Sequence, residues 1–228
     1  NMTRWHLGLS VVATDVGGGF SIGLGGLGFV MGLAGSWILC TGLIGAWLTA
    51  VVLIPKVHKT GLKNNLQTFP EILRFNYGKK VALVAAVISA IGYIGFAASQ
   101  LLAGAKLTAA TFQGISIDNA ILIMGFIAVI YTALGGIKAV IYTDTIQWII
   151  LLSGLSLIGI PFALKSVGGW DTAKTFLQPE MLQLSNIAPT TIINWAFSII
   201  PIWFIGMTLY QRIFAASSAK EAKRAWFI

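Results

Sequence analysis

Apolar residues fill six long stretches of this 228-residue chain, and shorter polar segments separate them. A helix of roughly 20 apolar residues is long enough to cross a bilayer. The pattern therefore predicts an all-α integral membrane protein with about six transmembrane helices. The expected helices run approximately over Leu7–Ala34, Ser36–Pro55, Val81–Phe112, Ala120–Leu134, Val140–Leu164 and Ile192–Ala215.

The first apolar stretch contains a carboxylate, Asp15, followed by Gly17, Gly18 and Gly19. A carboxylate at the centre of a membrane helix costs at least about 2.5–3.5 kcal/mol, and each glycine weakens a helix by about 1 kcal/mol relative to alanine. Broken backbone at membrane depth is tolerated where protein or a water-filled cavity surrounds it. The combination is typical of a discontinuous helix that lines an ion or solute site. The alternative is a glycine-rich helix packed closely on a neighbour.

Composition supports the membrane assignment, because 57% of the residues are hydrophobic and only 10% are charged, against about 25% charged in soluble domains. Twelve of the 15 Lys and Arg residues lie at one set of predicted helix ends and three at the other. Basic residues gather on the cytosolic side of membrane proteins. We therefore expect a multi-pass protein of the cell membrane, with both ends of this segment and the Lys56–Lys80 loop in the cytosol.

This placement accounts for the net charge of +8 without nucleic acid as a partner, and the basic ends are expected to meet anionic lipid of the bilayer. Cys40 is the one cysteine in the chain, so neither an intrachain disulfide nor a cysteine metal cluster can form within it. The two histidines lie near predicted helix ends, far from paired carboxylates. The chain offers no group of residues typical of a catalytic triad or a zinc site.

Two polar segments carry local structure signals. Thr68 and Glu71 match a capping box with Pro70 in the first turn, which predicts a short helix within Leu66–Tyr77. In the long segment Ser166–Thr190, the apolar residues Trp170, Phe176 and Leu177 indicate a partly ordered cap rather than a disordered tail.

The segment Gly23–Gly28 matches the pattern G-x-G-x-x-G. Dinucleotide binding requires that pattern between a strand and a helix of a soluble βαβ unit, and here it lies inside a predicted membrane helix. The Gly19-x-x-x-Gly23 and Gly28-x-x-x-Gly32 spacings instead favour close helix packing.

Asp15 allows three interpretations. It could pair with a buried cation, for which Lys106 is the candidate in this chain, or it could bind a cationic group of a solute. It could also lie beside a Na⁺ ion held by carbonyls that the interrupted helix leaves free, because hard cations prefer oxygen ligands. We favour the third interpretation.

A second dense polar cluster covers Tyr131–Gln147. Gly135-Gly136 predicts a turn, and Asp144 and Gln147 share a helix face near the cytosolic membrane level. Asp144 could alternatively be an acid in the first turn of a helix, where the helix dipole favours it.

The last apolar stretch contains Pro201 and Gly206, which predict another interruption near its middle. Trp203, between them, could face a cavity or lipid. Arg212 and the basic residues after it fit an ordinary cytosolic helix end.

Three blocks together resemble the sodium/solute symporter family. Tyr131–Gln147 resembles the family signature Y-x-x-x-G-G-x-x-A-V-x-x-T-D-x-x-Q. Ala13–Gly19 resembles the first core helix of the family, and Gln211-Arg212 with the run Ala215–Ser218 resembles the sixth. The blocks occur in family order, and the resemblance covers essentially the whole chain.

The resemblance implies the fold of the leucine-transporter group, with two inverted five-helix repeats and core helices 1 and 6 unwound at the site. Residues 1–165 would form the first repeat, residues 166–190 an extracellular or periplasmic segment, and residues 191–228 the start of the second repeat. The chain is then a single transmembrane domain and a piece of a longer transporter.

The resemblance also implies Na⁺ as the co-transported ion. The family binds Na⁺ partly through carbonyls of core helix 1, which match Ala13 and Val16. Asp15 matches an acidic position of the proline-transporting branch that is linked to Na⁺, and Asp144 matches the aspartate near the ion exit route.

The identity of the solute stays open among an amino acid, a carboxylate, a quaternary amine and another small solute. The substrate-binding candidates are Gly18, Phe20, Gln100 and Trp203. The sugar-transporting branch has polar residues where this chain has Gly18, Gly19, Ile38 and Leu39. The choline branch has an aromatic residue in place of Asp15.

We therefore expect a secondary active transporter, not an enzyme, that couples Na⁺ to the symport of a small organic solute by alternating access. The alternative is a membrane sensor or scaffold that kept the transporter fold and lost transport.

Overall fold

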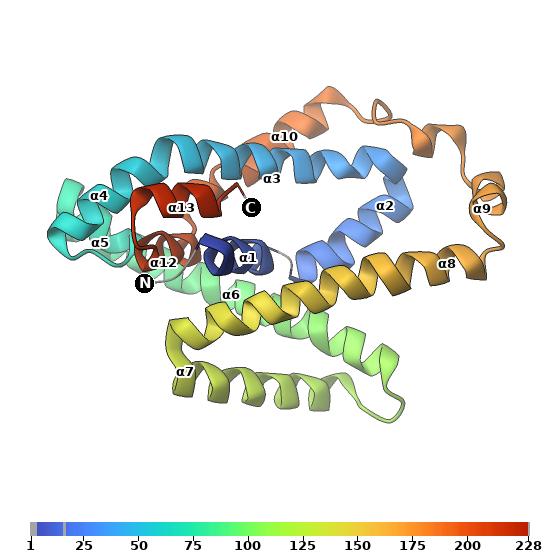
Figure 1. The fold of residues 1–228 in the computed structure, drawn as a ribbon, viewed down its shortest axis with the longest axis horizontal. Helices are drawn as coiled ribbons and strands as arrows, with labels where there is room; N and C mark the ends of the chain where they lie inside the picture. Colours follow the sequence, from blue (N-terminus) through green and yellow to red (C-terminus); the bar gives the residue numbers. More distant parts are fainter. Residues whose placement is uncertain (1–3, 16, 228) are drawn as a thin grey trace.

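The computed structural model describes residues 4–15 and 17–227, and every regular element within them is a helix. Figure 1 shows α1, α12 and α13 close together, with the long helices α6 and α7 to one side of them. The elements are α1 (Arg4–Asp15), η1 (Gly19–Leu24), α2 (Gly25–Met31), η2 (Gly32–Ser36), α3 (Trp37–Leu48), η3 (Thr49–Leu53), α4 (Ile54–Asn64), α5 (Phe69–Tyr77), α6 (Lys79–Thr111), α7 (Ile117–Ser153), η4 (Gly154–Gly159), α8 (Ile160–Ser166), α9 (Trp170–Phe176), η5 (Pro179–Leu182), α10 (Pro189–Ile199), α11 (Ile202–Ile205), α12 (Met207–Ala215) and α13 (Ala219–Ala225).

Long apolar helices confirm the all-α membrane class. Across the described ranges, four continuous helical stretches are long and apolar enough to cross a membrane: Ile22–Asn64, Lys79–Thr111, Ile117–Ile137 and Ala139–Ser166. A bent pair, Pro189–Ile205 with Met207–Ala215, makes a fifth. The count is lower than the six expected because the first expected helix is interrupted after Asp15, and its second half is counted together with the next helix in Ile22–Asn64, although the chain turns between them at Gly32.

The interruption predicted in the first apolar stretch is confirmed. Helix α1 ends at Asp15, and the helix resumes as the π-helix η1 at Gly19. Short π-helical segments occur frequently at functional sites. At Gly32, φ is +62°, a conformation that favours glycine, and Figure 1 shows the chain turning there from α2 into α3.

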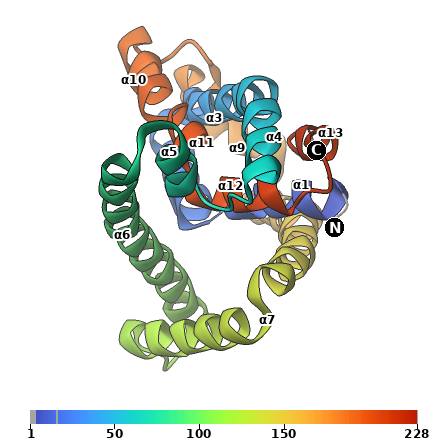
Figure 2. The same ribbon diagram turned by 90° about the vertical axis from the view of Figure 1, so that its left-hand side faces the viewer.

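The turn predicted at Gly135-Gly136 is also confirmed. Gly136 has φ 57° and ψ −164°, which is non-helical backbone inside α7. Figure 2 shows α7 changing direction sharply. The helices on either side are therefore separate candidate membrane crossings, Ile117–Ile137 and Ala139–Ser166.

The capping box predicted at α5 is present. The Thr68 hydroxyl accepts a hydrogen bond from the Glu71 N–H at 3.4 Å, and Glu71 Oε2 accepts one from the Thr68 N–H at 3.0 Å. Pro70 lies in the first turn. These bonds satisfy two N–H groups that the start of a helix leaves free.

The segment after α8 is partly ordered, as expected. It contains the short helix α9 and the 3₁₀-helix η5. The Trp37 indole N–H donates to the Leu184 carbonyl at 2.9 Å, and the backbone of Met181 packs directly on Gly32. The segment is therefore held against the corner between α2 and α3.

Helix breaks also shape the last apolar stretch. Helix α10 leads through Pro201 into the short α11, and the chain bends by 44° before α12. Gly206 has ψ 111°, which ends α11. The interruption predicted from Pro201 and Gly206 is confirmed.

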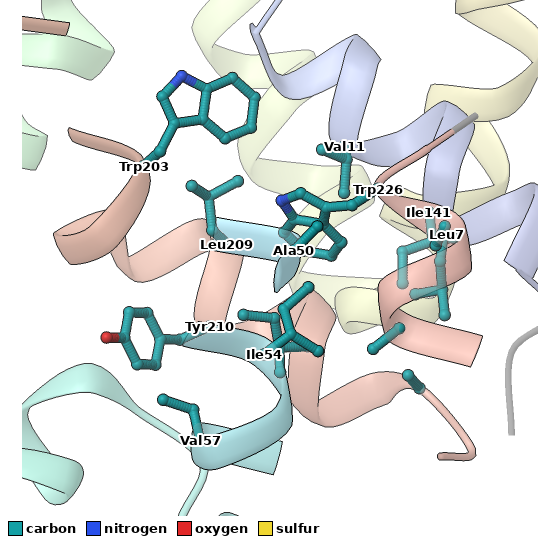
Figure 3. Close-up of a cluster of buried hydrophobic side chains, with 14 residues drawn as sticks. Leu7, Val11, Ala50, Ile54, Val57, Ile141, Trp203, Leu209, Tyr210 and Trp226 are labelled. Carbon is teal, nitrogen blue, oxygen red and sulfur yellow. The ribbon is translucent and has the colours of Figure 1, made fainter. Parts of the chain in front are cut away.

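The buried core lies where the first and last helices meet, as Figure 3 shows. Its members are Leu7, Val11, Ala50, Ile54, Val57, Ile141, Trp203, Leu209, Tyr210, Ile213, Ala216, Ala222, Ala225 and Trp226. By contrast, α6 and the first arm of α7 expose large apolar side chains such as Ile91 and Phe126. A bilayer solvates such surfaces. The packed core, in contrast, holds α1 against α12.

Candidate functional site

The interruption after α1 lies against the middle of α6. The Gly18 N–H donates a hydrogen bond to Oε1 of Gln100. A Cβ atom at Gly17 would overlap the Gln100 carboxamide, and one at Gly18 would overlap Cβ of Ala103. Close approach to α6 therefore requires glycine at position 18, where Ala103 cannot move aside, whereas a larger residue at position 17 would displace the Gln100 carboxamide. Two substrate-binding candidates that the sequence suggested separately, Gly18 and Gln100, are in contact.

Of the two expected Na⁺ ligands, the structure describes Ala13. Ala13 is in the last turn of α1, where the final four carbonyls of an α-helix have no intrahelical donor. Val16 lies outside the described residues, as do the side chains of Asp15 and Phe20. The Na⁺ site thus stays a prediction, with one of its two expected carbonyls at a helix end suited to it.

The second interruption, between α11 and α12, has partners for its freed backbone groups. The Thr49 hydroxyl donates to the Trp203 carbonyl at 2.9 Å, and the Tyr210 hydroxyl donates to the Phe204 carbonyl at 2.8 Å. The Thr208 N–H donates to the Tyr93 hydroxyl at 3.2 Å. Buried backbone groups must be paired, so these three side chains stabilise the break.

Trp203 is buried, with 8% of its surface exposed. Its ring packs against Gly45 of α3, where a Cβ atom would meet the indole. It faces neither lipid nor an open cavity. No described contact joins it to Gly18 or Gln100, so the substrate-binding candidates do not form one cluster among the described residues.

Arg212 of α12, Asp144 of α7 and Ser10 of α1 form a charged network. Arg212 Nη2 lies 3.0 Å from Asp144 Oδ2, and Arg212 Nε donates to the Ser10 hydroxyl at 2.9 Å. The Ser10 hydroxyl donates to the same Asp144 oxygen at 2.6 Å. Arg212 Nη1 donates to the Thr208 carbonyl of its own helix at 3.1 Å. Three helices are therefore joined through one carboxylate.

The network is shielded from solvent. The Arg212 and Asp144 side chains are 5% and 15% exposed, and Ser10 is fully buried. A buried ion pair of this kind tolerates the loss of one partner poorly, because the other charge is left uncompensated. The view of Arg212 as an ordinary helix-end cation is wrong, since its guanidinium is buried and bonded by all three nitrogens.

The structure also excludes the helix-dipole explanation of Asp144. The helix resumes directly after Gly136, so Asp144 lies beyond its first turn. Next to it, Thr145 lies 3.3 Å from the His6 ring nitrogen, and the His6 and Tyr142 rings meet edge to face with centroids 5.0 Å apart. These two contacts of His6, one turn before Ser10, attach α1 to α7 at a second point next to the ion pair.

The sequence analysis did not predict that Ser10 and Arg212 join the charged network. Nor did it predict that Thr49 and Tyr93 bond to backbone groups at the second interruption. One signal was available for Arg212, because it lies before the end of an apolar stretch, three residues ahead of Ala215. A cation and a carboxylate at the same membrane level on different helices are expected to pair.

The sequence profile of the Sodium:solute symporter family matches residues 1–228. This chain belongs to that family. Sodium/glucose cotransporter 1 of Ovis aries is 32% identical over 193 residues, which is 84% of this chain and 28% of that protein. Sodium/myo-inositol cotransporter 2 of Homo sapiens is 35% identical over 179 residues, 76% of this chain and 25% of that protein.

The Sodium/proline symporter of Escherichia coli (strain K12) is 27% identical over 237 aligned residues, 96% of this chain and 46% of that protein. The chain thus spans less than half the length of these relatives. Its family consists of transporters rather than enzymes, and its apolar helices are those of a multi-pass membrane protein.

The family blocks coincide with the charged network. The symporter signature Tyr131–Gln147 surrounds the turn at Gly136 and supplies Asp144. The third block supplies Arg212 from α12. The residues that carried the resemblance are therefore those that join α7 to the last interrupted helix.

Proposed function

We propose that the complete protein couples the downhill movement of Na⁺ to the uptake of a small organic solute by alternating access. The observation that carries this proposal is the presence of two interrupted helices, α1–η1 and α11–α12, in a member of a symporter family. Interrupted helices offer free carbonyl and N–H groups at membrane depth, where transporters bind ions and solutes.

Na⁺ is assigned to the end of α1. The carbonyls of Ala13 and Val16 supply neutral oxygen ligands of the kind hard cations prefer. The carboxylate of Asp15 adds negative charge beside them.

The solute is assigned to the surface between η1 and α6, with Gly18, Phe20 and Gln100 as the residues that contact it. Trp203, which is buried against Gly45 of α3 in this structure, would contact the solute in another state of the transport cycle. The names of the relatives make glucose, myo-inositol and proline the first solutes to test. At Ile38 and Leu39 this chain lacks the polar residues of the sugar-transporting branch, which favours proline over glucose and myo-inositol.

The network of Arg212, Asp144 and Ser10 serves as an inner latch. It fastens α1 to α12, which are the described segments adjoining the two interruptions. Switching elements of this kind have two discrete arrangements. In the closed arrangement the ion pair is intact, and release of Na⁺ and solute requires that α1 and α12 separate.

Uptake by the full-length protein in proteoliposomes tests the proposal. The three solutes are offered with an inward Na⁺ gradient, with equal Na⁺ on both sides, and with K⁺ in place of Na⁺. We expect one solute to accumulate only under the gradient. Equal uptake in all three conditions contradicts coupling. A folded protein that takes up no solute favours the sensor or scaffold alternative.

A further inference from the structure

The corner between α5 and α6 carries basic side chains that have no acidic partner among the described residues. Arg74, Lys79 and Lys80 are exposed, and none forms an ion pair with a described residue. The one acid between Lys56 and Lys80 is Glu71, whose carboxylate is engaged by backbone N–H groups of the capping box.

The position of the two lysines is unfavourable for the helix itself. Lys79 and Lys80 occupy the first turn of α6, where the helix dipole is positive and disfavours cations. A local anionic partner would relieve this cost. Basic residues gather on the cytosolic side of membrane proteins, and at this corner an anionic partner would in addition stabilise the start of α6.

A shallow apolar groove, open to the outside, begins at the same corner. Lys80, Val81, Val84, Ala85 and Ile88 line it. Their spacing places them on one face of α6 over about two turns. The valine and isoleucine side chains are exposed, and the groove runs into the part of α6 that is apolar enough to cross the membrane.

Aromatic side chains complete the corner. Phe75 and Tyr77, at the end of α5, are 55% and 70% exposed. Aromatic residues of this kind lie at the level of lipid headgroups. Figure 2 shows α5 beside the first turns of α6. The basic residues therefore match a lipid headgroup, the aromatic rings match the interface below it, and the groove matches an acyl chain.

We propose that the α5–α6 corner binds a phospholipid with an anionic headgroup. Arg74, Lys79 and Lys80 hold its phosphate, for which guanidinium and ammonium groups are suited donors. One acyl chain lies along the groove from Val81 to Ile88. This site is independent of the transport proposal, because none of its residues belongs to the ion or solute site.

Native mass spectrometry of the full-length protein tests the site, after extraction from nanodiscs of phosphatidylcholine with phosphatidylglycerol. The variant R74Q/K79Q/K80Q is compared with K106Q/K165Q/K174Q, which removes three exposed lysines elsewhere, one of them at the other end of α6. Each basic residue near an anionic surface contributes about 1 kcal/mol, or roughly a factor of five. We expect the first variant to retain phosphatidylglycerol at least tenfold less and the control to retain it normally.

A second variant separates the lipid from a free anion. Val84→Trp fills the groove and leaves the three charges intact, and we expect it to lose phosphatidylglycerol as well. Excess inorganic phosphate should not displace the lipid from the unchanged protein.

Three results would overturn the proposal. Equal retention by the two triple variants removes the basic corner as the site. Displacement by phosphate, with normal retention by Val84→Trp, identifies a free-anion site instead. No retained phosphatidylglycerol on the unchanged protein means that another partner, such as the rest of its own chain or an acidic protein, covers this face.

Discussion

Arg212 and Asp144 are 68 positions apart in the sequence, yet Arg212 Nη2 lies 3.0 Å from Asp144 Oδ2 in a largely buried ion pair. The pair joins α12, which follows the last helix interruption, to α7. Through Ser10 it also holds α1, which precedes the first interruption. A single carboxylate therefore links the two interrupted helices on this side of the protein, beside the apolar core that they share.

Arg212→Gln is expected to destabilise the protein strongly, because it leaves Asp144 buried without a counter-charge. Loss of one partner of a buried ion pair costs about 3–5 kcal/mol. Adding Asp144→Asn to Arg212→Gln should recover part of that loss, since no unpaired charge remains. Thermal unfolding of the full-length protein in detergent, arranged as a double-mutant cycle, measures the coupling.

The exposed pair Arg224–Glu221, with 3.2 Å between Nη1 and Oε1, supplies the control. Arg224→Gln and Glu221→Gln should each change stability by no more than about 1 kcal/mol, because water screens exposed pairs. Additive effects of Arg212→Gln and Asp144→Asn would show that the two side chains are not coupled in the folded protein.

Asp144→Ala is expected to slow transport more than it changes the apparent affinity for solute. Asp144 contacts Ser10 and Arg212 rather than the solute-binding candidates, so it acts on opening and closing of the latch. Transport rates are measured per folded molecule, because the variant also lowers stability. Asp171→Ala, at an exposed position, is the matched control. Normal normalised rates in Asp144→Ala would refute the latch.

Gly18→Ala is expected to displace η1 from α6, because its Cβ would overlap Cβ of Ala103. Overpacking of this kind costs about 1–3 kcal/mol. Ala103→Gly in the same molecule should restore both folded yield and Na⁺-dependent uptake. Gly26→Ala, where no neighbour lies within 4 Å, should be tolerated. Failure of Ala103→Gly to rescue Gly18→Ala would mean that this close approach is not the reason for the glycine.

Thr49→Val is expected to leave the Trp203 carbonyl without its donor at the second interruption. An unsatisfied buried carbonyl costs about 1–3 kcal/mol, and the melting temperature should fall accordingly. Thr41→Val is the control, because Thr41 is equally buried but bonds to a carbonyl of its own helix, at 2.7 Å. Equal melting temperatures for the two variants would show that Thr49 does not stabilise the break.

Local features of the fold could be predicted because adjacent residues determine them. Four local features lie where the sequence predicts them. They are the helix interruption after Asp15, the turn at Gly135-Gly136, the interruption at Pro201 and Gly206, and the capping box of Thr68 and Glu71. Each depends on backbone freedom or hydrogen bonds within a few residues. The exact position of the turn between the first two expected helices was harder to predict, because the chain turns at Gly32, where φ is +62°, and not at Gly35.

Side-chain partners across the fold could not be predicted in the same way. Arg212 meets Ser10 and Asp144 from positions 202 and 68 residues away, and those distances depend on how three helices pack. In the sequence, Arg212 looked like one more residue of a charged helix end, because the basic residues Lys220, Lys223 and Arg224 follow it. The sequence could not decide whether Trp203 faces a cavity or lipid, because this also depends on how the helices pack. In the structure α3 covers it.

The central claim is that Na⁺ bound where α1 ends drives solute uptake. Initial uptake rates as a function of external Na⁺, for the full-length protein and for Asp15→Asn, test it most directly, with Asp118→Asn at an exposed helix start as the control. The account predicts saturable activation by Na⁺, with the half-activating concentration raised about tenfold or more by Asp15→Asn, equivalent to about 1.4 kcal/mol of lost binding, and unchanged by Asp118→Asn. Uptake that does not depend on Na⁺, or a Na⁺ dependence that Asp15→Asn leaves unaltered, would contradict it.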